Sequence, residues 1–256
     1  MTLSASCFSP EDIRHFEDRG YLVARGLADP ALRGRMKALA ADHLARAVPP
    51  VEYEADVGYP GAPASRAAPG GRTVRRLLQA YARDALFRDW ASSPALGERL
   101  KQLLGPQVML SQAHHNCVMT KNPGFSSVTH WHQDVRYWSF RRAELVSVWL
   151  ALGREHAGNG CLQVLPGTHT MTFRRELLDE KLFLRADLAE NRELLSTRRA
   201  VELDGGDVLF FHCRLFHAAG DNQTAETKFS PVFTYHAADN PPVPGTRSAS
   251  SPEVMI

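Results

Sequence analysis

The stretch from residue 145 to residue 167, LVSVWLALGREHAGNGCLQVLPG, contains the pattern that decides the fold. Its two apolar runs, Leu145–Leu152 and Cys161–Leu165, have the length and the branched side chains typical of strands. The turn signal Gly158-Asn159-Gly160 separates the two runs, and Pro166-Gly167 follows the second. Short apolar runs with this punctuation indicate a sheet whose strands are joined by tight turns.

The same pattern extends in both directions, over residues 106–240. Further strands are predicted at Val108–Thr120, Ala200–Leu203, Val208–Cys213 and Phe229–His236. Turn signals separate these strands as well, among them Asn122-Pro123-Gly124 and Gly220-Asp221-Asn222. Many short strands with such turns predict a sandwich or barrel, and a jelly roll is the commonest form with an internal site. We therefore predict a mainly β, cupin-like jelly roll with flanking helices, and an insertion of helical composition at residues 171–199.

Residues 1–105 are predicted to be a largely helical part of the same single domain. Ser9 and Pro10 mark the start of a helix that ends at Gly20, and a short strand, 21–23, follows it. Helical spacing recurs over residues 30–47, around 74–81 and over 94–104. Residues 49–72 are rich in proline, glycine and alanine, and a loop of this length is a candidate lid.

The composition disfavours several classes of protein. The 256 residues are 44% hydrophobic and carry a formal net charge of only +2, which argues against a nucleic-acid or membrane partner. No apolar run approaches the roughly 20 residues that span a bilayer, and residues 1–7 lack a secretory pattern. The four cysteines are far apart, so we expect reduced thiols and a cytoplasmic location rather than disulfides or a cysteine zinc site.

The segment THWHQD, residues 129–134, carries the predicted chemistry. Alternate residues of an extended chain share a face, so the side chains of His132 and Asp134 should point the same way. An imidazole and a carboxylate side by side can bind one metal ion. A third ligand from a distant strand would complete the two-histidine, one-carboxylate triad used for Fe(II) oxygen chemistry.

The third ligand should lie on a later strand that faces the first. The candidates are His169, His212, His217 and His236. His217 is favoured because it follows the strong strand 208–212 and precedes the turn at Gly220, and His212 is the alternative. His114 and His115 are adjacent, so only one of them should line the interior of a regular barrel.

At these residues the sequence resembles the phytanoyl-CoA dioxygenase family of Fe(II)/2-oxoglutarate oxygenases. The resemblance covers most of the chain: residues 16–23, the motif HQD at 132–134, NGCLQVLPGTH at 159–169, and GDV at 206–208 leading to His217 and Asn222. It implies a double-stranded β-helix in which His132, Asp134 and His217 bind Fe(II). It also implies an enzyme that uses 2-oxoglutarate and molecular oxygen to oxidise a small molecule, with succinate and CO2 as co-products.

The family also has a basic residue, normally arginine, eleven positions after the last iron ligand, where it binds the distal carboxylate of 2-oxoglutarate. Here that residue is Lys228, which offers a charge without the two-pronged geometry of arginine. Ser230 should share its face of the strand and assist it, whereas the serine common two positions after the last ligand is replaced by Ala219. Further residues predicted to flank the co-substrate are Gln133, Trp149 and Lys121.

Halogenating relatives replace the iron carboxylate with a small residue, so the presence of Asp134 favours hydroxylation. The departures at Lys228 and Ala219 leave open a jelly-roll protein that binds a metal or an acidic ligand without 2-oxoglutarate turnover. A cupin-like isomerase, or a dioxygenase without a keto acid, is a further alternative. Substrate choice is expected to depend on residues 49–72 and 171–199. Basic residues in the second segment suggest an acidic substrate: Arg174, Arg175, Lys181 and Arg185.

Overall fold

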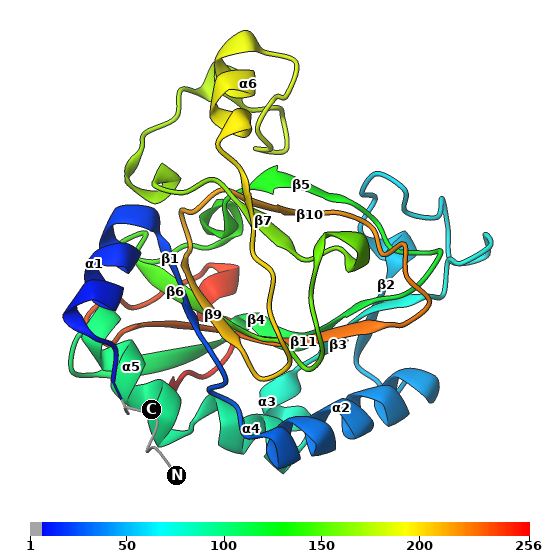
Figure 1. The fold of residues 1–256 in the computed structure, drawn as a ribbon, viewed down its shortest axis with the longest axis horizontal. Coiled ribbons are helices and arrows are strands. Elements are labelled where there is room, and N and C mark those ends of the chain that lie inside the picture. The colour runs from blue at the N-terminus through cyan, green and yellow to red at the C-terminus, as the bar shows by residue number, and fades with distance from the viewer. Residues whose placement is uncertain (1–6) are drawn as a thin grey trace.

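Two antiparallel β-sheets form the centre of the computed structural model, which describes residues 7–256 (Figure 1). The larger sheet has eight strands, seven of them in the order β1-β9-β6-β11-β4-β3-β2, while β12 pairs with β4. The smaller sheet has the order β5-β10-β7-β8. The strands are β1 Tyr21–Ala24, β2 Val51–Tyr53, β3 Val74–Leu78, β4 Val108–Lys121, β5 Thr129–His132, β6 Leu145–Leu150, β7 Leu162–Val164, β8 Arg199–Ala200, β9 Val208–His212, β10 His217–Ala219, β11 Lys228–Ala237 and β12 Val254–Met255.

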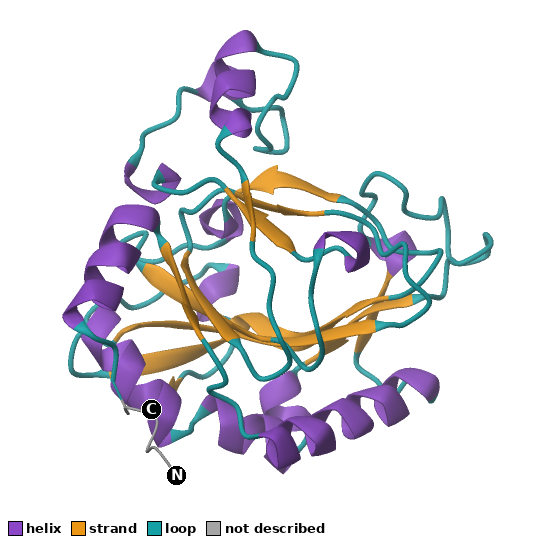
Figure 2. Ribbon diagram, viewed as in Figure 1, coloured by secondary structure: helices purple, strands orange, loops and turns teal. Residues whose placement is uncertain are grey.

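Helices cover the outer face of the larger sheet, while α6 projects beyond the smaller sheet (Figure 2). The α-helices are α1 Pro10–Arg19, α2 Pro30–Ala45, α3 Ala80–Arg83, α4 Ala85–Ala91, α5 Pro94–Leu104 and α6 Ala189–Ser196. The short 3-10 helices are η1 Glu54–Asp56, η2 Asp134–Tyr137, η3 Ala157–Asn159, η4 Thr168–Thr170, η5 Arg175–Leu177 and η6 Arg247–Ala249. Among residues 7–256, no helix has the length and apolar character needed to cross a membrane.

The larger sheet is buried on both faces, and strand alternation divides its side chains between two cores. Phe210 of β9 packs with Met36 and Leu100 of the covering helices, whereas its neighbours Leu209 and Phe211 pack toward the smaller sheet. Because successive side chains of a strand point to opposite faces, one continuous apolar run contributes side chains to the cores on both faces of the larger sheet. The prediction of a mainly β fold with flanking helices is confirmed.

In the N-terminal part, several of the predicted helices are confirmed and one prediction is wrong. The side chain of Ser9 accepts a hydrogen bond from the backbone of Asp12, and α1 ends at Gly20, whose φ is 79°, as the sequence predicts. Residues 74–78, expected to be helical, instead form β3 between β2 and β4. A five-residue run with apolar residues at both ends fits both the helical and the strand periodicity. Its pairing partners lie far away in the sequence, so the local pattern cannot distinguish the two.

The two segments expected to control substrate access are only partly irregular. Residues 49–72 contain β2 and η1, and the remainder is a loop. Residues 171–199 contain η5 and α6 within mostly irregular chain, so they are less helical than their composition suggests.

Candidate metal centre

A cavity of about 330 Å³ is lined by residues from both sheets. His132, Asp134 and His217 all line it and all are buried. His132 ends β5 and His217 begins β10, and the two histidines lie directly opposite each other in the antiparallel ladder. Asp134 begins η2, so the strand ends before it and the chain turns its carboxylate toward the two rings.

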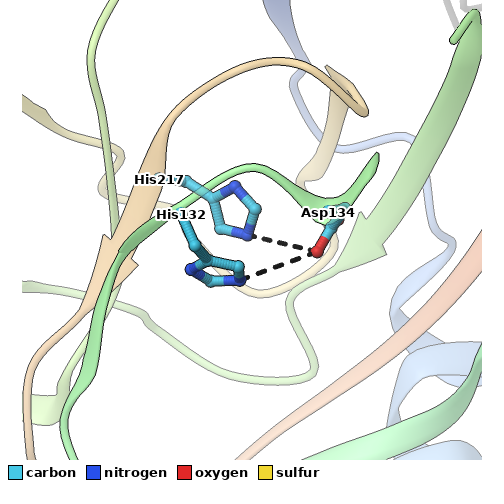
Figure 3. A group of neighbouring side chains, drawn as sticks. All are labelled: His132, Asp134 and His217. Atoms are coloured by element: carbon cyan, nitrogen blue, oxygen red, sulfur yellow. Dashed lines mark ion pairs between the residues drawn. The ribbon is translucent and has the colours of Figure 1, made fainter. Parts of the chain in front are cut away.

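The three side chains converge on one point (Figure 3). Their ligand atoms all lie within 4.8 Å of one another. Oδ1 of Asp134 lies 3.7 Å from Nε2 of His132 and 3.6 Å from Nε2 of His217. Both distances are too long for hydrogen bonds, and they leave room for an ion between the three atoms.

The other nitrogen of each histidine fixes the tautomer. Nδ1 of His132 lies 2.8 Å from the carbonyl oxygen of His130, and Nδ1 of His217 lies 3.1 Å from that of Leu215. A carbonyl oxygen only accepts, so each Nδ1 must donate and each Nε2 keeps its lone pair. Burial lowers the pKa of both imidazoles, which favours the neutral form that binds metals. Two lone pairs and a carboxylate that face one another without a shared proton fit a divalent cation.

His115 was missed as a member of this site. Its Nε2 donates to Oδ1 of Asp134 at 3.2 Å, and Ser147 Oγ lies 3.5 Å from Oδ2. Burial opposes ionisation of Asp134, but the surrounding histidines, His115 first, hold the pKa of its carboxyl below the usual range. The ionised carboxylate is the form that a metal requires.

The expectation that only one of His114 and His115 lines the interior is wrong, because both line the cavity. Thr234 and Phe233 of β11 are consecutive, yet they pair with Ser111 and Asn116 of β4. The four intervening residues of β4 therefore form a bulge that breaks the alternation of side chains.

The alternative third ligands lie elsewhere. Nδ1 of His212 accepts from the backbone of Arg214, and its ring packs 5.3 Å from that of His169. His236 is paired with Glu253. Over residues 7–256, no other group of three histidine, cysteine or acidic side chains offers ligand atoms this close together.

The predicted carboxylate-binding residues surround a carboxylate of the protein itself. Nζ of Lys228 lies 2.9 Å from Oε2 of Glu155, and Ser230 Oγ donates to Oε1 at 2.6 Å. The indole Nε1 of Trp149 donates to the same oxygen at 3.0 Å. Lys228 and Trp149 line the cavity, whereas Ser230 lies behind them with no exposed surface. Sequence reasoning missed Glu155, which lies in the loop after β6.

The other two residues predicted near the co-substrate differ in position. Lys121 lines the cavity opposite Lys228 in the β4–β11 ladder, and its Nζ donates to the carbonyl of Ser127 at 2.8 Å. Gln133 does not line the cavity, because its side-chain amide donates to the carbonyl of Arg214. The prediction that Gln133 flanks the co-substrate is therefore not supported by its position.

Four side chains from three segments form a mouth cluster beside the metal centre: Tyr59, Arg136, Tyr137 and Phe183. The hydroxyls of Tyr59 and Tyr137 lie 3.2 Å apart. The ring of Phe183 packs edge-on against Tyr59 at 5.9 Å and against His132 at 5.8 Å. The guanidinium of Arg136 lies 3.8 Å from the centre of the Phe183 ring and 4.2 Å from that of Tyr137. Residues 49–72 and 171–199 thus meet beside His132.

The sequence model described as phytanoyl-CoA dioxygenase (PhyH) matches residues 16–230. The chain belongs to this family. It is 26% identical over 235 residues to a probable phytanoyl-CoA dioxygenase of Caenorhabditis elegans, covering 87% of this chain and 73% of the relative. It is 28% identical over 236 residues to the peroxisomal phytanoyl-CoA dioxygenase of Homo sapiens, covering 87% and 67%.

Solved structures share the fold. EctD from S. alaskensis, solved with 2-oxoglutarate and 5-hydroxyectoine, has a TM-score of 0.75 at 20% identity, covering 95% of this chain and 80% of that one. The epimerase SnoN, in complex with Fe3+, alpha ketoglutarate and nogalamycin RO, has a TM-score of 0.72 at 21% identity, covering 91% and 85%. These comparisons confirm the predicted jelly-roll fold, and family membership confirms the predicted class, an Fe(II)/2-oxoglutarate-dependent dioxygenase.

Proposed function

We propose that this dioxygenase hydroxylates an acidic small molecule at an iron ion held by His132, Asp134 and His217. The observation that carries the proposal is the convergence of two Nε2 lone pairs and one ionised carboxylate inside a cavity. His132, Asp134 and His217 would hold the ion and leave other positions open for the keto acid and oxygen. With Asp134 as a ligand, a halide would not find the place that a small residue leaves, which favours hydroxylation.

Iron in such a site would activate molecular oxygen, which is the oxidant of both the keto acid and the substrate. The chain itself orients the ligands and limits water. The backbone carbonyls of His130 and Leu215 fix the two rings, and His115 fixes the carboxylate. Phe211 packs 5.1 Å from His217, and Phe183 packs against His132, so both rings have an aromatic neighbour that limits solvent.

The proposal of an acidic substrate is supported by two arginines that have no acidic partner, Arg136 and Arg247. Arg75 and Arg76 also line the cavity but do not count as support, because both are paired with Glu52. Arg247 lines it without an ion pair in the described chain, and Arg136 has two buried nitrogens that lack a hydrogen-bond partner. A carboxylate of the substrate would satisfy such a guanidinium.

The sequence-based reason for an acidic substrate is not supported. Arg174 is paired with Glu190 and Arg185 with Asp187, and these four side chains are 41–69% exposed. These basic residues of the insertion face solvent, so the acidic substrate is now proposed on Arg136 and Arg247 instead.

The first test is an anaerobic titration of Fe(II) into the apo-protein with 2-oxoglutarate, followed by its visible metal-to-ligand charge-transfer band. We expect a band with the wild type and none with Asp134→Ala, because the variant lacks one of three ligands. Asp187→Ala, which removes an exposed carboxylate, is the control and should keep the band. No band from the wild type at saturating iron and keto acid would favour the metal-binding protein without turnover.

The substrate class is tested by succinate release under air. Small carboxylic acids should increase the rate of release, whereas their neutral amides should not, and Arg247→Met should reduce the response to the acids. Arg174→Met is the matched control outside the cavity. An equal response to acids and amides would contradict the acidic substrate while leaving the iron site intact.

A cytoplasmic location is also proposed, supported by the positions of the cysteines. Cys117, Cys161 and Cys213 are buried as thiols in the structure, which suits a reducing compartment. Fractionation of cells that express the tagged full chain tests this location directly.

A further inference from the structure

We propose that Lys121 is the charge partner of the distal carboxylate of 2-oxoglutarate, and that Glu155 is a positioning residue that neutralises Lys228. This inference rests on the proposed function, because it concerns the same cavity. The sequence predicts that Lys228, at the family position of the carboxylate-binding cation, binds the distal carboxylate. We assign that role to Lys121 instead.

Glu155 is held firmly in place. Its carboxylate accepts hydrogen bonds from Lys228, Ser230 and Trp149, and only 1% of the residue is exposed. Its backbone forms two hydrogen bonds with Leu203, at 2.7 Å and 3.0 Å. An incoming carboxylate would have to replace three buried donors at once to expel Glu155, and a displaced buried carboxylate is strongly disfavoured. Glu155 therefore stays when the co-substrate binds.

The ammonium of Lys228 is consequently already neutralised. Its side chain is only 4% exposed, and its Nζ also lies 5.0 Å from the centre of the Trp149 ring. The Lys228–Glu155 pair contributes no net charge to the cavity wall. A neutral pair offers a carboxylate ligand far less attraction than an unpaired cation would.

Lys121 is the neighbouring cation without such a partner. Within the described part of the chain, no carboxylate lies within 4.0 Å of its Nζ, which donates only to the carbonyl of Ser127. It is half-buried and directly opposite Lys228 on the adjacent strand, a position in which like charges repel. Lys121, Lys228 and Glu155 together carry one net positive charge, which a bound carboxylate would balance.

The titration of Lys121 agrees with this role. Burial first, and then the charges of Lys228 and Arg75, lower the pKa of Lys121 to about 7, while the more distant carboxylates of Glu54 and Asp221 oppose this shift. Binding of an anion favours the protonated form. Above pH 7 the protein should therefore take up a proton when 2-oxoglutarate binds.

The test measures binding of 2-oxoglutarate to the Mn(II)-loaded protein by calorimetry at pH 8, in buffers of different ionisation enthalpy. Lys121→Met should bind about 100-fold more weakly and lose the proton uptake. Lys228→Met should also bind weakly, because Glu155 is left as an unpaired carboxylate beside the cavity. The double variant Glu155→Gln/Lys228→Met replaces one neutral pair with another, and we expect it to bind within about fivefold of the wild type. Lys37→Met, on the exposed side of α2, is the matched control.

The double variant separates the two assignments. If it binds as weakly as Lys228→Met while Lys121→Met binds normally, Lys228 is the charge partner and the inference is wrong. Thermal unfolding shows whether a variant with one substitution fails to fold. In that case the charge-neutral double variant decides which lysine is the charge partner. A wild type that binds no 2-oxoglutarate at all would instead contradict the proposed function.

Discussion

At the scale of single residues, the site depends on what each histidine nitrogen does. Nδ1 of His132 and of His217 donates to a backbone carbonyl, so Nε2 is left to bind the ion. His115 differs, because it donates to Asp134 instead of pointing its lone pair at the centre. The three histidines are identical in chemistry, and only their neighbours decide which of them can serve as ligands of the proposed metal ion.

His115→Leu is predicted to weaken metal binding by roughly 10- to 100-fold without abolishing it, because Asp134 loses the donor that orients it. Competition with a metal chelator measures the change. His114→Leu is the control, since His114 also lines the cavity but pairs with Ser248. Equal losses in the two variants would show that cavity shape, and not the bond to Asp134, is responsible.

Glu155 and Lys228 show what a sequence can say about a single residue. The position of Lys228 follows from its spacing to His217, which is local and readable. Its partner Glu155 lies 73 residues earlier, on a loop whose approach depends on the packing of β6 and β11. No local pattern marks Glu155, so the pairing became visible only in the structure.

At the scale of elements, local chemistry fixes the ends of helices more reliably than the identity of short strands. The cap at Ser9 and the left-handed Gly20 bound α1 as predicted. The sequence predicts a helix around residues 74–81, but residues 74–78 form β3, because this strand depends on pairing with its distant partners β2 and β4. The bulge in β4, which brings His115 to the metal centre, likewise has no signature in its own residues.

The junction between α1 and β1 gives a prediction at this scale. Gly20→Ala should lower the free energy of unfolding by roughly 2–4 kcal/mol, because φ is positive and the new Cβ would meet Nδ1 of His169 at 2.5 Å. Gly26→Ala is the matched control, with φ of +60° but no atom within 4 Å, and should lose only about 1 kcal/mol. Urea unfolding measures both, and equal losses would mean that contact with His169 is harmless.

At the scale of the whole molecule, the metal centre connects the two sheets. His132 and His217 belong to the smaller sheet, whereas His115 and Ser147 reach Asp134 from β4 and β6 of the larger one. An ion held by His132, His217 and Asp134 would therefore connect the smaller sheet to the larger one through Asp134, in addition to the apolar contacts between the two sheets.

Metal binding is accordingly predicted to stabilise the entire fold. A divalent ion at about 100 times its dissociation constant should raise the free energy of unfolding by about 2.7 kcal/mol. For a chain of this size, the midpoint of thermal unfolding should rise by roughly 5–10 °C. Chelation should reverse the rise, and Asp134→Ala should show none. A comparable rise in that variant would place the stabilising ion outside the proposed centre.

The mouth cluster has a consequence for engineering. Tyr59 and Phe183 come from two segments more than a hundred residues apart and pack against each other, and Phe183 also packs against His132. A chimera that takes only residues 171–199 from another family member would leave Tyr59 facing a foreign surface. Transferring the substrate preference of another family member would therefore require both segments, together with Arg136 and Tyr137, which contact Phe183 and Tyr59. If these three segments set substrate selectivity, they should be varied together, because a library that changes one segment alone would lose its contacts with the other two.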